Sequence, residues 1–133
     1  MTILLVEHYA PLARALVRGL AEEGIAVQVA RDDVEADVRA RAVPYAALVV
    51  DWNVPCKGGA ALVQNWRRNG LAAPILMFVP SSGDADRLLG VAAGANEVLP
   101  LPFSFGDLLA RLRSWLPSPK LSGAAPFAAA NQA

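Results

Sequence analysis

The sequence predicts an α/β fold in which a five-stranded parallel sheet is doubly wound, with helices on both faces. Two observations predict it. Short apolar runs alternate five times with amphipathic segments over residues 1–116 of the 133-residue chain. The strand-like runs are continuous apolar runs and do not alternate as in a strand with one wet face, so we expect a parallel sheet that is covered on both faces.

The first three strand–helix repeats occupy the N-terminal half of the chain. Their strands are expected at Thr2–Val6, Ile25–Ala30 and Ala46–Asp51, and their helices at Pro11–Glu23, Asp33–Arg41 and Ala60–Asn69. In the first helix, apolar residues recur at helical spacing between Pro11, in the first turn, and Gly24, which ends the helix. One proline and two glycines mark the loop Trp52–Gly59 before the third helix.

The last two repeats have strands at Ile75–Val79 and Glu97–Leu99. Their helices follow Ser81, Ser82 and Asp84, ending near Ala93, and span Phe105–Leu116, with Ser104 as the N-terminal cap. We therefore expect residues 1–116 to form one domain. Residues 117–133, rich in Pro, Ala, Ser and Gly, are expected to form a flexible tail or linker.

The composition excludes several classes of function. Twelve basic residues balance twelve acidic ones, so charge gives no reason to expect direct binding of nucleic acid or of an anionic membrane. No apolar run is long enough to span a bilayer. The single cysteine cannot form an internal disulfide, which fits a reducing compartment. We expect a cytoplasmic protein.

Asp51 is the residue most indicative of function, because it places a carboxylate at the end of an apolar strand. A carboxylate is costly to bury and is usually kept for chemistry or for a specific partner. In a doubly wound sheet the carboxyl ends of the strands form the binding edge. Glu7, His8, Val79 and the segment Pro100–Pro102 are expected at that same edge.

Several residues around Asp51 stand at the spacing of a known family. They are Pro55 and Gly59 in the loop, Pro74 before the fourth strand, Gly94-Ala95 before the fifth, and Pro102-Phe103 after it. With these residues the chain resembles the receiver domain of two-component response regulators from about Thr2 to Leu116. The resemblance implies a flavodoxin-like sheet with strand order 2-1-3-4-5.

The resemblance also implies roles for individual residues. Asp51 occupies the position that accepts a phosphoryl group from a histidine kinase. The positions that hold a divalent metal in the family are Glu7, His8, Asp51 and the carbonyl of Asn53. Three further positions of the family's switch carry a hydroxyl, a lysine and an aromatic ring, and here they are Val79, Leu101 and Val98.

These departures predict an atypical receiver. Val79 cannot donate a hydrogen bond and Leu101 cannot neutralise an oxyanion, while His8 suits Mg²⁺ less well than a carboxylate. We expect a pseudo-receiver that signals through protein contacts largely without phosphorylation of Asp51. The alternative is a phosphoacceptor receiver that is phosphorylated on Asp51 and binds magnesium weakly.

Other interpretations of the site stay open. Asp51 could be an inherited carboxylate that bonds loop amides or pairs with His8, and Glu7, His8 and Asp51 together could take Zn²⁺, Mn²⁺ or Fe²⁺. A small-molecule site near Val79 and Leu101 is a third possibility. No resident cofactor and no enzymatic activity are expected, since His8 is the only histidine and no serine has a nucleophile-elbow setting.

The expected partners are proteins: a histidine kinase, an output domain or another regulator. By the resemblance, the first helix would dock the kinase. The fourth helix, fifth strand and last helix would form a face for a homodimer, with candidate contact residues Leu88, Leu89, Val91 and Trp115.

Overall fold

The computed structural model describes residues 1–116, and the predicted tail at 117–133 lies outside them. Five strands form one parallel sheet: β1 (Thr2–Val6), β2 (Ala26–Ala30), β3 (Ala47–Asp51), β4 (Ile75–Val79) and β5 (Glu97–Pro100). Their order across the sheet is β2-β1-β3-β4-β5, as predicted. The reversal of order between β1 and β3 places a switch point beside the carboxyl ends of these two strands.

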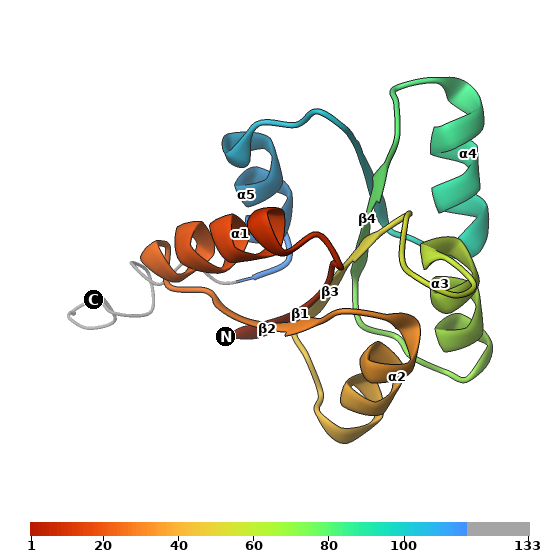
Figure 1. Ribbon diagram of the computed structural model, residues 1–133, viewed down its shortest axis with the longest axis horizontal. Helices are drawn as coiled ribbons and strands as arrows, with labels where there is room; N and C mark the ends of the chain where they lie inside the picture. Colours follow the sequence, from red (N-terminus) through yellow and green to blue (C-terminus); the bar gives the residue numbers. More distant parts are fainter. Residues whose placement is uncertain (117–133) are drawn as a thin grey trace.

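Five helices cover the sheet: α1 (Ala10–Glu22), α2 (Asp33–Ala42), α3 (Gly59–Arg68), α4 (Asp84–Ala93) and α5 (Phe105–Arg113). α1 and α5 lie on one face, and α2, α3 and α4 on the other (Figure 1). The strands supply both apolar layers, because Leu4 and Val50 face the second group of helices while Leu5 and Val49 face the first. This two-sided burial confirms the interpretation of the continuous apolar runs.

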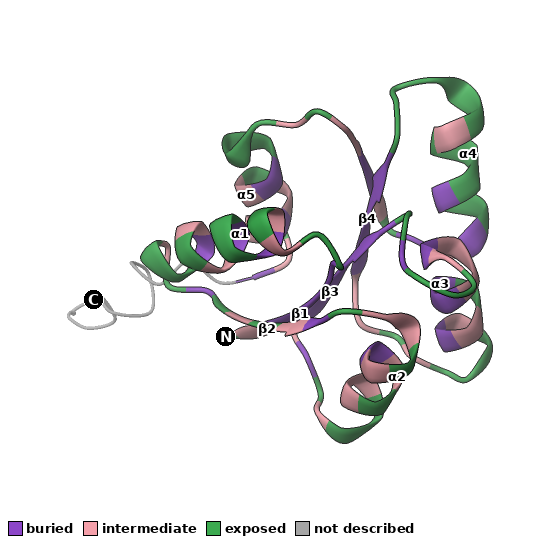
Figure 2. Cartoon of the chain, in the orientation of Figure 1, coloured by how far each residue is buried: buried purple, intermediate pink, exposed green. Residues whose placement is uncertain are grey.

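Burial is greatest in the central strands (Figure 2). Every residue of β3 and β4 is buried, whereas β2, at the edge of the sheet, exposes alternate residues. An edge strand of this kind leaves a row of unpaired backbone N–H and C=O groups, and part of one face of the sheet, accessible to solvent or to another molecule.

The predicted helix and strand boundaries are correct to within a residue or two, except at the end of α5. That helix was predicted to reach Leu116 but ends at Arg113. The hydroxyl of Ser114 donates to the carbonyl of Arg111 (2.6 Å), and the amide of Trp115 turns back three residues to Leu112 (3.0 Å). These contacts replace the regular helical bond from the Trp115 amide to the Arg111 carbonyl, although the amide of Leu116 still donates to Leu112 at 3.0 Å. Ser104 caps the start of α5 as predicted, accepting from the amide of Asp107 at 3.1 Å.

Candidate functional site

Asp51 is the last residue of β3 and is 6% exposed. Its Oδ1 accepts a hydrogen bond from the amide of Asn53 at 3.3 Å, so the side chain is oriented by the loop that follows it. In the neighbouring strand Phe78 pairs with it in register. The predicted position of a carboxylate at the carboxyl edge of the sheet is therefore confirmed.

Gly59 fixes the path of the loop around Asp51. A Cβ at this position would lie only 2.2 Å from the carbonyl oxygen of Asp51, so no other residue fits without moving the backbone. The Gly59 amide donates to the carbonyl of Trp52 at 3.0 Å and closes the loop. The first turn of α3 thus packs directly against the end of β3.

Glu7 follows β1 and is 1% exposed, which makes it the most deeply buried charged residue described. Its Oε2 accepts from the amide of Tyr9 at 3.2 Å, but Oε1 has no hydrogen-bond partner among residues 1–116. Burial, and secondly the neighbouring carboxyl group of Asp51, raise the pKa of Glu7 to about 8. The two carboxyl groups therefore share a site in which an added proton or cation is favourable.

His8 does not join this pair. Its side chain is exposed, and its carbonyl accepts from the guanidinium of Arg31 at 3.2 Å. Within residues 1–116, no three His, Cys, Asp or Glu side chains form a group that could hold a metal ion. The physical reason is the alternation of an extended backbone, which turns Glu7 inward and the next residue outward. The predicted set of Glu7, His8 and Asp51 is therefore reduced to its two carboxylates.

The positions expected to contact a phosphoryl group are apolar and packed. Val79 is fully buried, in a cluster that contains Val50 and Val54. Leu101 is partly buried, its amide donates to the Val79 carbonyl at 2.9 Å, and the peptide bond between Leu101 and Pro102 is cis. Neither side chain can donate a hydrogen bond or carry a positive charge.

Val98 in β5 is buried beneath α4. A Cβ added to Gly90 of α4 would lie 2.7 Å from Val98 Cγ2, so this glycine lets the helix approach the strand closely. On the same helix Leu88, Leu89 and Val91 are all exposed. The contact holds α4 close to β5 and leaves three large apolar side chains of α4 exposed.

Three tryptophans differ in their setting. Trp52 beside Asp51 is exposed, Trp66 is buried with its Nε1 donating to Asp37 at 3.1 Å, and Trp115 packs partly buried against the core.

No helix among residues 1–116 has both the length and the apolar character needed to cross a membrane.

Comparison with known proteins identifies a family. A model of the response regulator receiver domain matches residues 3–113. The chain is 38% identical over 116 residues to the transcriptional regulatory protein TctD of Salmonella typhimurium, which covers 87% of this chain and 52% of TctD. It is 36% identical over 126 residues to the response regulator MprA of Mycobacterium leprae, covering 94% of this chain and 55% of MprA. The chain thus spans about half the length of the curated relatives it matches.

Solved structures show the same fold. The receiver domain of the Francisella response regulator 1452 superposes with a TM-score of 0.83 at 24% identity, covering 86% of this chain and 94% of that one. The chemotaxis protein CheY4 of Vibrio cholerae gives 0.79 at 26% identity, covering 86% and 98%. The receiver domain of Saccharomyces cerevisiae Ssk1, solved together with the histidine phosphotransfer protein Ypd1, gives 0.79 at 19% identity, covering 86% and 88%.

Proposed function

Because the chain belongs to the response regulator receiver domain family, we propose that it serves as the receiver of a two-component regulator, with Asp51 as a slow phosphoacceptor. The buried pair of Glu7 and Asp51 carries this proposal. A second carboxyl group beside Asp51, with one oxygen that has no partner among residues 1–116, is costly unless a cation or proton joins it. A cation bound between the two carboxyl groups would offset that cost.

The pair fits a hard divalent cation in its donor chemistry, because Mg²⁺ prefers oxygen ligands. The unpartnered Oε1 of Glu7 and the raised pKa of that group are the observations that support the fit. Asp51, Glu7 and the carbonyl of Asn53 would hold the ion, which would supply positive charge beside the incoming phosphoryl group. Since His8 stays outside the pair, we expect the affinity to be weak.

In the proposed reaction an Asp51 oxygen attacks the phosphorus of a donor, the bond from phosphorus to the donor breaks, and the leaving group takes up a proton. The amide of Asn53 holds the carboxylate in place. Val79 and Leu101 stabilise none of the charge that develops on the phosphoryl oxygens. Loss of one such donor typically costs about 10²–10³ in rate, so we expect slow acceptance. The domain would act as an acceptor in signalling and not as an enzyme on a small-molecule substrate.

A second candidate is a pseudo-receiver that signals without phosphorylation. The packing of Val98 against Gly90 favours it, because α4 approaches β5 closely at this point and position 98 carries no aromatic ring that could move. In this case Val79 and Leu101 are ordinary core and loop residues. The two candidates differ in one property, which is whether Asp51 can accept a phosphoryl group.

The proposed partners are proteins in both cases. The receiver domain of Ssk1, which shares this fold, was solved with a phosphotransfer protein, and we propose that a kinase or a phosphotransfer protein also engages this chain. The exposed Leu88, Leu89 and Val91 on α4 support a homodimer through the face formed by α4, β5 and α5. Such a contact would cover apolar surface that is costly to leave in water.

The experiment that tests the proposal incubates the full chain with a small phosphodonor, such as phosphoramidate, at saturating Mg²⁺. Intact-mass analysis over time should show one added phosphoryl group, which Asp51→Asn removes. Glu7→Gln should slow the modification, while Glu22→Gln, on the exposed surface of α1, should leave it unchanged. A wild-type chain without any modification after prolonged incubation would favour the pseudo-receiver.

A further inference from the structure

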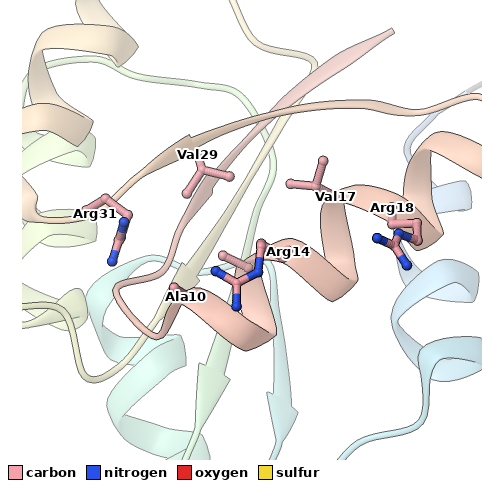
Figure 3. Close-up of a pocket in the computed structure, with 7 residues that line it drawn as sticks. Ala10, Arg14, Val17, Arg18, Val29 and Arg31 are labelled. Atoms are coloured by element: carbon pink, nitrogen blue, oxygen red, sulfur yellow. The ribbon is translucent and has the colours of Figure 1, made fainter.

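A shallow groove runs between α1 and the edge strand β2, and neither Glu7 nor Asp51 lines it (Figure 3). Its floor is apolar and consists of Ala10, Ala13, Val17 and Val29. Its remaining lining residues are three arginines, two from α1 and one from the end of β2: Arg14, Arg18 and Arg31. Of the residues that the structure describes, no acidic one lines the groove, although the chain as a whole is neutral.

The arginines of this groove are poorly neutralised. Arg14 and Arg18 are exposed and form no hydrogen bond or ion pair with any residue of the described part of the chain, 1–116. Among residues 1–116, the guanidinium of Arg31 donates only to the carbonyl of His8. Arg14 and Arg18 lie one helical turn apart, an arrangement of like charges that destabilises a helix slightly. Carboxylates brought by another molecule would relieve this repulsion.

The groove occupies a separate side of α1 from the one that meets α5. Gly19 contacts α5, since a Cβ there would lie 2.8 Å from Cε1 of Phe105. At 100° per residue, Gly19 points away from the direction shared by Ala10, Arg14 and Val17. The groove is therefore accessible without disturbing the packing between the two helices.

We propose that this groove binds an acidic amphipathic helix of a partner protein. The apolar floor would take the apolar stripe of such a helix, as in other helix-in-groove contacts. Carboxylates spaced four residues apart would meet Arg14 and Arg18, whose planar guanidinium groups pair well with carboxylates. Arg31 would lie on the β2 side of the bound helix, across the groove from Arg14 and Arg18.

The charge of the groove distinguishes this occupant from others. Residues 117–133 contain a lysine and no acidic side chain, so the chain's own tail lacks the complementary charge. A nucleic acid would meet the arginines but would place phosphates and sugars over an apolar floor. The inference concerns the partner of the receiver and holds whether or not Asp51 accepts a phosphoryl group.

The test uses a designed fluorescent peptide of about five helical turns, with leucines on one face and glutamates at four-residue spacing on a flank. A matched peptide carries glutamine in place of each glutamate. Fluorescence anisotropy with the full chain, without phosphodonor or metal, should show saturable binding of the acidic peptide. We expect the glutamine peptide to bind at least about tenfold more weakly, and binding of the acidic peptide to weaken as salt is added.

Variants of the chain locate the binding. The double variant Arg14→Glu/Arg18→Glu should lose at least about tenfold in affinity. Its matched control, Arg68→Glu/Arg87→Glu, changes the charge equally at exposed positions on α3 and α4 and should keep wild-type affinity. Amide shifts on binding should centre on Arg14, Val17 and Val29. Circular dichroism confirms that both variants are folded.

Three results would overturn the inference: no saturable binding of the acidic peptide, equal binding of the glutamine peptide, or equal losses in the two double variants. Binding of a single-stranded oligonucleotide that depends on Arg14 and Arg18, with no binding of the peptide, would assign the groove to nucleic acid instead. Because no phosphodonor is present, none of these results bears on phosphorylation of Asp51.

Discussion

Glu7 shows how one buried residue sets the character of the site. It is an acidic side chain with 1% exposure, and beside Asp51 its pKa is raised from 4.5 to about 8. In this environment the neutral form is favoured, because neither solvent nor a described side chain compensates the second negative charge. Below its raised pKa, Glu7 is therefore expected to carry a proton.

This raised pKa predicts how stability depends on pH. Between about pH 4.5 and pH 8 the folded chain keeps a proton on Glu7 that the unfolded chain releases. The free energy of unfolding should therefore fall as pH rises through this window, by up to about 1.4 kcal/mol per pH unit from this group. In Glu7→Gln that contribution is absent. Urea unfolding at a series of pH values measures it.

A control and a metal titration sharpen the measurement. Glu22→Gln changes an exposed carboxylate and should keep the wild-type slope. At about pH 8, Mg²⁺ should stabilise the wild type more than Glu7→Gln, since only the wild type can exchange the proton for the ion. Equal slopes in wild type and Glu7→Gln would show that Glu7 does not titrate in this window.

At the scale of elements, α4 packs against β5 through Gly90 and Val98. Gly90 and Val98 touch so closely that a methyl group on the glycine has no room. Alanine in a helix is favoured over glycine by about 1 kcal/mol, but overpacking costs about 1–3 kcal/mol. The two effects oppose each other at this position, and the crowding should be the larger.

We therefore predict that Gly90→Ala destabilises the wild type by about 1 kcal/mol and stabilises a Val98→Ala background, where the space has been opened. Denaturant unfolding of the four proteins in this cycle gives both values. Gly106→Ala in α5, where the nearest atom to an added Cβ is 3.9 Å away, should stabilise both backgrounds. If Gly90→Ala stabilised the wild type as well, α4 would not be held against β5 as the structure shows.

At the scale of the whole molecule, the sequence predicts the architecture well because the sheet is buried on both faces. A continuous apolar run such as Ile75–Val79 buries all its side chains when it lies in the centre of a parallel sheet, where both faces are covered. The end of α5 was missed, because the side chain of Ser114 competes for a backbone carbonyl that the apolar pattern does not register. Local polar contacts of this kind change a boundary and leave the fold unchanged.

The site was less predictable than the fold. The sequence indicates which residues follow the strands, and hence that Glu7 and Asp51 share an edge. It does not indicate how far burial raises the pKa of Glu7, since that depends on packing across strands, and the prediction grouped His8 with Glu7 although an extended backbone points successive side chains in opposite directions. The arginine groove was missed for a similar reason: Arg14 and Arg31 are far apart in sequence and meet only when α1 lies beside β2.

The most direct test of the account compares the rate of phosphoryl transfer to Asp51 in the wild type and in Val79→Thr/Leu101→Lys, at saturating Mg²⁺ and with phosphoramidate as donor. We predict slow modification of the wild type and an increase of at least about 10²-fold in the variant, since a hydroxyl and a cation return to the phosphoryl oxygens. The substitution Asp51→Asn should abolish the modification in both backgrounds. Equal rates in a folded variant, or no modification of the wild type, would contradict the claim that Asp51 is a phosphoacceptor slowed by its apolar neighbours.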